Sequence, residues 1–180
     1  MRNFILSAIV LLLTSACGYH FSGEGSGPVP GLRYVAIPVF ENKTSEPDLG
    51  SIFAGDLRRA FIQKGPIQVV EQEAAEAVFW GSVTNIYTSA VAHRDVNHDV
   101  TSRVTLENRL YVTISIRCVD TRTGRVIWQD PSFTYYKVYS QVSNVSNPDP
   151  VVNFDNRRRA LQYLSEEMAI RIHDRFLSNF

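Results

Sequence analysis

Three long stretches of the chain alternate hydrophobic and polar residues, which is the period of a β-strand with one buried face. In the second stretch, Val112, Ile114 and Ile116 share one face, while Thr113 and Ser115 share the other. A tight-turn sequence at residues 121–124 joins the second stretch to the third and predicts a hairpin. The three predicted strands cover residues 77–92, 104–120 and 125–140.

A shorter strand is predicted before these three, over residues 32–40. Val35, Ile37 and Val39 fall on one face of it, so we expect these three side chains to be buried together. Pro38 has no amide hydrogen, which places it near the end of the strand or on an edge of the sheet.

Two further stretches repeat apolar residues at three- and four-residue spacing, which predicts amphipathic helices. Asp48 is the candidate N-cap of the first helix, and Gly65 follows its last turn. The second helix is expected to begin near Asp155, after a loop over residues 141–153. The predicted buried stripes are Leu49, Ile52, Phe53, Leu57, Ala60 and Phe61 in the first helix, and Leu161, Leu164, Met168, Ile172, Phe176 and Phe180 in the second.

With a short strand at residues 67–70, the order of elements is β–α–β–β–β–β–α. This order predicts an α+β fold, a two-layer sandwich with two helices packed on one face of the sheet. The long alternating strands favour a mostly antiparallel, mixed sheet of four to five strands. The first strand–helix–strand unit is where a parallel pair is expected.

The N-terminal region carries the features of a lipoprotein export signal. Residues 1–16 combine a basic start, a short apolar run and small residues, and Cys17 follows directly. The sequence resembles a lipobox, in which the cysteine thiol is lipidated and cleavage makes it the N-terminus, although Thr14 stands where leucine is usual. An ordinary secretory signal is the alternative. Residues 17–31 then form a flexible Gly- and Pro-rich tether, and residues 32–180 a single domain.

Charge and cysteine content narrow the classes of partner. The chain has 18 Lys and Arg residues against 18 Asp and Glu residues, so no basic excess indicates nucleic-acid binding. With Cys17 lipidated, Cys118 has no disulfide partner. We therefore expect Cys118 to be a free thiol that packs as a small hydrophobic side chain in the core.

The sequence contains no phosphate loop, nucleophile elbow or zinc-protease helix. His93, Asp95, His98 and Asp99 lie in one predicted loop, but their spacing fits no structural metal site. We therefore predict a protein that is not an enzyme and that uses no metal or other cofactor.

Several basic residues are candidates for binding an anion. Arg157, Arg158 and Arg159 stand in the first turn of the second helix, where positive charge opposes the helix dipole. They form either a solvated turn, with Asp155 as a compensating cap, or a contact with glycolipid phosphates or with acidic loops of a partner. The full set of candidates is Arg94, Arg103, Arg122, Arg125, Lys137, Arg157, Arg158 and Arg159.

Five motifs are spread over most of the predicted mature chain. They are Cys17-Gly18-Tyr19-His20-Phe21, the segment 32–47 with Phe40-Glu41-Asn42-Lys43-Thr44, Gly81-Ser82-Val83, Thr123-Gly124 before Ile127-Trp128, and Arg159-Ala160-Leu161. Together these motifs resemble those of the LptE family of outer-membrane lipoproteins, which assemble lipopolysaccharide. One departure is Glu76-Ala77-Val78, where many members have an Ala-Asp pair before a Gly-x-Val strand.

The resemblance implies two helices against a four-stranded sheet and a role in binding rather than catalysis. Family members plug the large outer-membrane β-barrel LptD and help it deliver lipopolysaccharide to the outer leaflet. The expected partners are therefore the LptD β-barrel and lipopolysaccharide. Gly18 follows the cysteine, whereas aspartate there retains enteric lipoproteins at the inner membrane. The lipid anchor is thus expected in the periplasmic leaflet of the outer membrane.

Two other functions remain open. The segment Val35–Thr44 also resembles lipoproteins that activate peptidoglycan synthases and those of curli-type secretion. The Cys-Gly-Tyr-x-Phe start and the short tether favour the LptE family, because contact with the cell wall calls for a longer linker. A lipoprotein of unrelated role on the same scaffold is the third possibility. Co-purification of a large heat-modifiable barrel, rather than of a penicillin-binding enzyme, distinguishes the first two.

Overall fold

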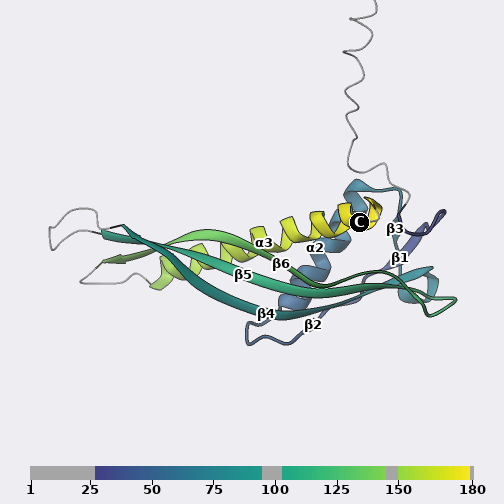
Figure 1. Cartoon of the computed structure of the whole chain (residues 1–180), viewed down its shortest axis with the longest axis horizontal. Coiled ribbons are helices and arrows are strands. Elements are labelled where there is room, and N and C mark those ends of the chain that lie inside the picture. Colours follow the sequence, from purple (N-terminus) through teal and green to yellow (C-terminus); the bar gives the residue numbers. More distant parts are fainter. Residues whose placement is uncertain (1–26, 95–102, 145–149, 179–180) are drawn as a thin grey trace, which may run out of the picture.

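Three long strands dominate the computed structural model, which describes residues 27–94, 103–144 and 150–178 (Figure 1). The elements follow the predicted order, with one extra short strand. The strands are β1 (Tyr34–Ala36), β2 (Glu41–Asn42), β3 (Gln68–Val69), β4 (Ala77–Arg94), β5 (Arg103–Asp120) and β6 (Val126–Asn144). The helices are α2 (Leu49–Lys64) and α3 (Pro150–Ser178), with a short 3-10 helix, η2 (Gln72–Ala74).

The sheet is mixed, as predicted, and the strands lie in the order β3-β1-β4-β5-β6. Strands β4, β5 and β6 form an antiparallel meander, in which Val78 pairs with Val119 and Ile114 with Phe133. β1 is parallel to both β3 and β4, which confirms the parallel pair expected from the first strand–helix–strand unit. β2 adds a second parallel pairing along β4.

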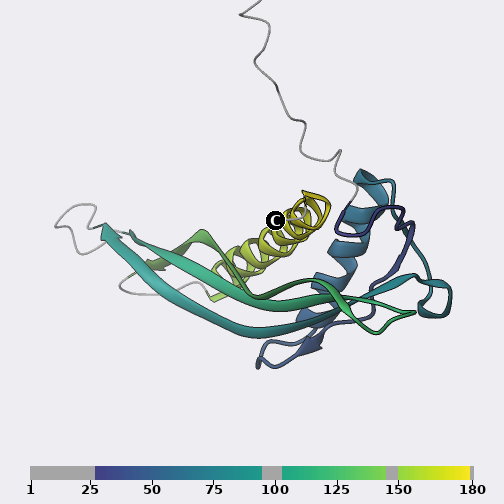
Figure 2. The ribbon, with the colours of Figure 1, turned by 45° about the vertical axis from the view of Figure 1, so that its right-hand side comes forward.

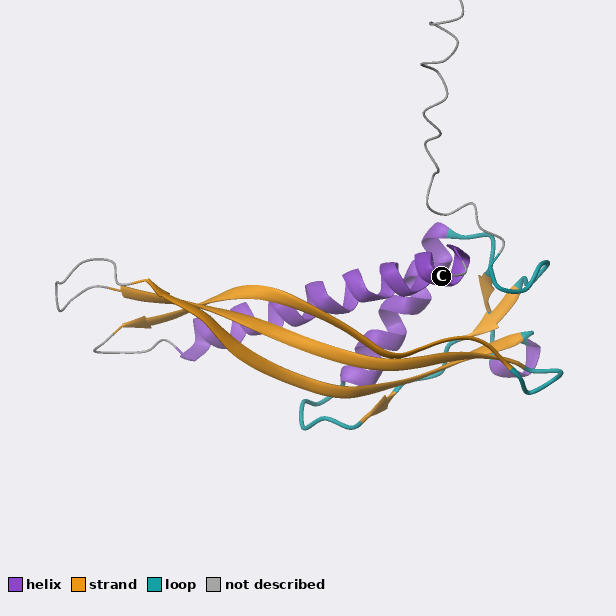
Figure 3. Ribbon diagram, viewed as in Figure 1, coloured by secondary structure: helices purple, strands orange, loops and turns teal. Residues whose placement is uncertain are grey.

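Both helices lie on the same face of the sheet, which curves around them (Figures 2 and 3). The alternation of β5 explains this arrangement, because its even-numbered residues from Leu110 to Cys118 are buried beneath the helices. The predicted stripe of α3 is buried as well, from Leu161 to Phe176, and Phe180 lies outside the described residues. In α2 only Ile52 departs from the predicted stripe, since it is exposed.

The prediction of one strand over residues 32–40 is wrong in its second half. The amide of Phe40 donates to the Gly50 carbonyl (3.3 Å), and Arg58 Nε donates to the Ile37 carbonyl (2.7 Å). These bonds draw the segment after Ala36 towards α2, and Pro38 has no amide with which to continue the ladder. Val39, expected in the buried face, is consequently 60 % exposed.

The beginnings of both helices also differ from prediction. Asp48 takes a left-handed conformation (φ 61°) and its side chain makes no capping hydrogen bond, so it is not a side-chain cap. α3 begins at Pro150 rather than near Asp155, so part of the predicted loop 141–153 is helical. Proline is tolerated in the first turn of a helix because an amide there lacks an intrahelical partner in any case.

Candidate functional site

The long strands end at two opposite ends of the sheet (Figure 1), and most of the predicted basic residues lie near one end or the other. At the distal end, β4 stops at Arg94, β5 begins at Arg103 and α3 begins at Pro150. At the hairpin end, the turn 121–124 joins β5 to β6. At roughly 3.3 Å per residue, a strand of 18 residues separates the two ends by about 60 Å.

Arg94 and Arg103 are brought to the same end by the register of the meander. Arg94 pairs with Thr105, and Arg103 pairs with Asn144 at the end of β6. The structure describes the backbone of these positions only, so what their side chains contact stays a prediction.

Arg122 and Arg125 lie at the hairpin end, far from the other candidates, and both are exposed. The neighbouring Asp120 accepts hydrogen bonds from Thr123, from its amide (2.6 Å) and from its hydroxyl (2.8 Å). Chiefly these bonds, with a smaller contribution from the charge of Arg122, hold the pKa of the Asp120 carboxyl below its usual value. The local polar contacts therefore hold the turn together, and one binding site cannot include all the predicted cations.

The side chains of the three consecutive arginines of α3 make different contacts. Arg157 Nη1 lies 2.7 Å from Glu46 Oε1, a contact that ties α3 to the loop before α2 and raises the pKa of the guanidinium. Arg159 pairs with Asp155 one turn earlier, and both side chains are largely exposed. Arg158 is exposed and has no ion pair among the described residues. Asp155 thus pairs within the helix and does not cap it, so the capping interpretation is wrong.

Lys137 is held against α3 by an aromatic ring. Its Nζ lies 3.6 Å from the centroid of the Tyr163 ring, within the range of a cation–π contact. Two arginines of α3 make similar contacts with β6, Arg171 with Tyr135 and Arg175 with Phe133. Lys137 therefore belongs to the contact between α3 and the edge strand.

Exposed apolar residues accompany the arginines in the first turns of α3. Val151 is 73 % exposed and Phe154 67 % exposed, and with Arg158 they follow the three- and four-residue spacing of one helix face. We call Val151, Phe154, Arg158 and Arg159 the tip surface. The sequence-based assignment of residues 141–153 to a loop concealed it, and the signal that could have revealed it is Pro150 followed by two valines and Phe154.

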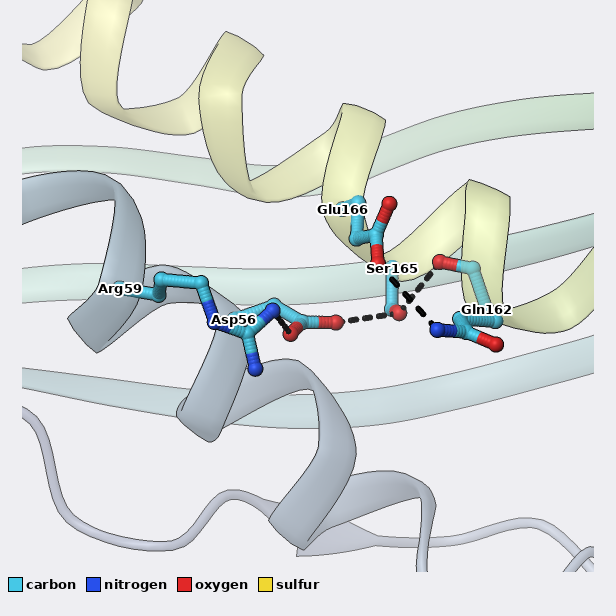
Figure 4. A network of polar contacts seen from close by, with 5 residues as sticks. All are labelled: Asp56, Arg59, Gln162, Ser165 and Glu166. Atoms are coloured by element: carbon cyan, nitrogen blue, oxygen red, sulfur yellow. Dashed lines mark hydrogen bonds and ion pairs between the residues drawn. The ribbon is translucent and has the colours of Figure 1, made fainter. Parts of the chain in front are cut away.

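A polar network joins α2 to α3 (Figure 4). The Asp56 carboxylate is 8 % exposed, accepts a hydrogen bond from the hydroxyl of Ser165, and lies 2.6 Å from Arg59 Nη1. On α3, Gln162 Nε2 donates to Glu166 Oε1 (3.4 Å). No histidine takes part in these contacts among the described residues, and the buried groups of this network, Asp56 and Ser165, are both hydrogen-bonded. The network therefore fixes how α2 and α3 pack.

Of the remaining predicted residues, Cys118 is buried and His93 lies near the end of β4, so it is not in a loop as predicted. Cys118 is buried, as predicted, and burial, with a smaller contribution from Asp120, raises the pKa of its thiol to about 12. Within the described ranges, no three potential ligands among His, Cys, Asp and Glu come together, and no helix is long and apolar enough to cross a membrane. Cys17, Asp95, His98 and Asp99 lie outside the described residues.

Comparison with solved structures finds similar folds of low sequence identity. The hypothetical protein CT253 from Chlamydia trachomatis matches with a TM-score of 0.47 and 12% identity over 83% of this chain and 99% of that one. A putative neuraminyllactose-binding hemagglutinin homolog from Helicobacter pylori has a TM-score of 0.47 and 14% identity, with 88% of both chains covered. A minor lipoprotein from Acinetobacter baumannii gives 0.42 and 14%, over 82% and 94%. Similarities of this size assign no function.

Comparison with protein families gives a clearer result. No curated protein matches the chain. A family model described as "LptE: Lipopolysaccharide-assembly" matches residues 32–176, which cover nearly the whole predicted domain and most of the chain. Two helices on one face of a mixed, mostly antiparallel sheet are consistent with that family. The chain belongs to the LptE family of lipopolysaccharide-assembly proteins.

Proposed function

We propose that this protein is an outer-membrane lipoprotein that binds lipopolysaccharide and occupies the lumen of the LptD β-barrel. It acts by binding alone and makes or breaks no covalent bond. The family match carries this proposal, because it extends over residues 32–176. The near balance of 18 basic and 18 acidic residues and the largely polar open face of the sheet suit a body enclosed in a water-filled barrel.

The tip surface is the contact that we propose for lipopolysaccharide. Phe154 and Val151 offer exposed apolar area to acyl chains. The guanidinium of Arg158 can donate paired hydrogen bonds to a phosphate, and that of Arg159 can do the same by exchanging its solvent-exposed ion pair with Asp155 for the phosphate. Arg94, the last residue of β4, and Arg103, the first of β5, lie at the same end of the sheet and would add positive charge near the tip surface. Arg157 and Lys137 already have partners within the fold, so they contribute by positioning α3.

The position of the N-terminal segment supports this arrangement. The Gly27 amide donates to the carbonyl of Leu177 (3.2 Å), so the chain enters the domain at the C-terminal end of α3. α3 has 29 residues, which at about 1.5 Å per residue places its two ends roughly 43 Å apart. A lipid on Cys17 would thus attach the domain at one end and leave the tip surface at the other.

Lipopolysaccharide binding by the full-length protein in detergent tests the tip surface. Arg158→Gln with Arg159→Gln should weaken binding at least tenfold, because two charge-assisted contacts are lost. The matched control is Arg122→Gln with Arg125→Gln, which removes the same charge from exposed positions at the hairpin end. Equal affinities of the two double variants would show that the tip surface is not the contact.

The lipid anchor is tested separately by Cys17→Ala. This variant should lose incorporation of labelled palmitate, because the thiol that would carry the lipid is removed. Cys118→Ala is the matched control, because that thiol is buried in the core. Palmitate labelling that persists in the Cys17→Ala variant would contradict lipidation at this residue.

A further inference from the structure

The open face of the sheet, opposite the helices, carries a pocket of about 490 Å³ beside the interruption between β1 and β2. β1 leaves β4 after Ala36 pairs with Val78, and β2 rejoins it where Glu41 pairs with Ser82. Between these points, no strand of the described residues pairs with this edge of β4. We call the hollow at this place the sheet-face pocket, and its volume falls within the range of about 300–1,000 Å³ that small-molecule sites occupy.

Four side chains from two adjacent cross-strand pairs line the sheet-face pocket. Trp80 pairs with Arg117, and Ser82 pairs with Ser115. Side chains alternate between the two faces of a strand, and residues next to these four in the chain, such as Cys118, are buried beneath the helices. All four side chains therefore lie on the open face. The register of β4 and β5 therefore places an indole, a guanidinium and two hydroxyls side by side on the open face.

None of the three groups that would recognise a ligand is engaged within the fold. The Trp80 side chain is 42 % exposed and makes no contact with another ring or a cation among the described residues. Arg117 is exposed and has no ion pair or hydrogen bond in that part of the chain. Ser82 Oγ is buried and has no hydrogen-bond partner there either.

The ring of Phe40, which lies against Gly81, closes the base of the pocket. A Cβ atom at Gly81 would lie 2.6 Å from the ring of Phe40, so glycine is needed for this ring to lie on β4. Phe40 is itself fixed by its amide, which donates to the Gly50 carbonyl. The pocket is therefore held in shape by the core before any ligand binds.

The charge of the rim favours an anion. Lys43 pairs with Glu41 (3.3 Å), and both side chains are more than half exposed, so this pair is close to neutral. The guanidinium of Arg117 is left as the uncompensated charge, and its planar set of donors fits a carboxylate or a phosphate. An indole, two hydroxyls and one guanidinium together suit an acidic sugar. The apolar C–H face of the sugar ring would stack on the indole, and its acidic group would pair with the arginine.

We propose that the sheet-face pocket binds a saccharide unit that bears a carboxylate or a phosphate. The sugar ring lies on Trp80, and its anionic group pairs with Arg117. Its hydroxyls bond to Ser115 and, once the Ser82 side chain turns its buried hydroxyl towards the pocket, to Ser82. This site lies on the open face and does not include the tip surface, so it does not depend on the proposed contact with lipopolysaccharide.

Ligand-observed saturation-transfer NMR on the full-length protein, in a detergent without a sugar headgroup, tests the proposal. The probes are glucuronate, glucose 6-phosphate, glucose and inorganic phosphate. We expect saturation of the ring protons of glucuronate or glucose 6-phosphate, and the stronger of the two identifies the acidic group. Binding of glucose as strong as that of both acidic sugars, or no binding of either acidic sugar, would overturn the proposal.

Two variants locate the signal. Arg117→Gln should weaken acidic-sugar binding at least tenfold, whereas Arg122→Gln, an exposed arginine of the adjoining turn, should leave it unchanged. Trp80→Ser should abolish saturation transfer, and an unaltered near-ultraviolet circular dichroism signal from the buried Trp128 would confirm that the core is intact. If inorganic phosphate competes as well as glucose 6-phosphate, the pocket is a simple anion site and the saccharide assignment is wrong.

Discussion

The two faces of the sheet use aromatic residues in opposite ways. Beneath the helices, Phe79 and Phe176 meet edge to face, with ring centroids 4.9 Å apart at 67°, and both rings are fully buried. On the open face, Tyr87 and Tyr111 stack with centroids 4.7 Å apart at 4°, and Tyr136 continues the row at 5.3 Å from Tyr111. Tyr87 and Tyr136 remain nearly half exposed.

This difference separates the residues that fold the protein from those available for binding. The covered rings are surrounded on all sides, so each removed ring leaves a cavity. The open rings are aligned by strand register and lose little area if shortened. Substitutions on the two faces should therefore differ sharply in their effect on the free energy of unfolding.

The largest effect is expected from Phe79→Ala. Phe79 is fully buried against Phe61, Phe176 and Trp128, so the variant should lose about 3–5 kcal/mol of the free energy of unfolding. Urea denaturation followed by circular dichroism measures this loss. A loss below about 1 kcal/mol would mean that the covered ring cluster does not hold the core together.

The second-largest loss of stability is expected from Asp56→Ala, because this variant removes the buried hydrogen-bond acceptor that joins α2 to α3. The hydroxyl of Ser165, which is fully buried, would keep only the Gln162 carbonyl as a partner, so we expect a loss of about 1–3 kcal/mol. Arg59→Ala is the control, because its side chain is 57% exposed and its ion pair should contribute less than about 1 kcal/mol. Equal losses in the two variants would contradict the buried role of Asp56.

Cys118, directly after the exposed Arg117, gives the covered face a dependence on pH. Its folded pKa is about 12, against 9.0 for an unperturbed thiol, so above pH 9 the unfolded chain loses a proton that the folded one keeps. The free energy of unfolding should therefore fall between pH 9 and 12, by up to about 1.4 kcal/mol per pH unit. Denaturation of the wild type and of Cys118→Ala at pH 8 and pH 10 isolates this contribution. Parallel behaviour of the two proteins would exclude it.

The smallest effect is expected from Tyr136→Ala on the open face. Tyr136 is 45 % exposed and contacts Tyr111 and Arg109, so the loss should be about 0.5–1 kcal/mol. The same denaturation experiment measures it. A cost approaching that of Phe79→Ala would remove the distinction between the two faces.

The long strands, the hairpin and the buried stripes of both helices could be predicted, because each depends on a local repeat. Cys118 could be assigned to the core in the same way, since it continues the apolar alternation of Ile114 and Ile116. The interruption of the first strand could not be predicted. It depends on the contact of Phe40 with Gly50 and on the bond from Arg58 to Ile37, which only the folded chain brings together.

The two proposed binding surfaces were harder to predict than the fold. The sequence identified Arg157, Arg158 and Arg159 as a group. In the structure, however, Arg157 forms an ion pair with Glu46 and Arg159 forms one with Asp155. The tip surface was concealed by the assumption that Pro150 lies in a loop. The sheet-face pocket depends on the register that pairs Trp80 with Arg117, across 37 residues of chain, and no local pattern fixes that register.

Pull-down of the full-length lipoprotein from detergent-solubilised membranes tests the proposed function most directly. If the protein plugs the LptD barrel, a β-barrel of large mass that migrates differently before and after heating should co-purify in a one-to-one ratio. The barrel should co-purify equally with the wild type and with the Arg122→Gln variant. Recovery of a penicillin-binding enzyme in place of a barrel, or of no barrel at all, would contradict the proposal.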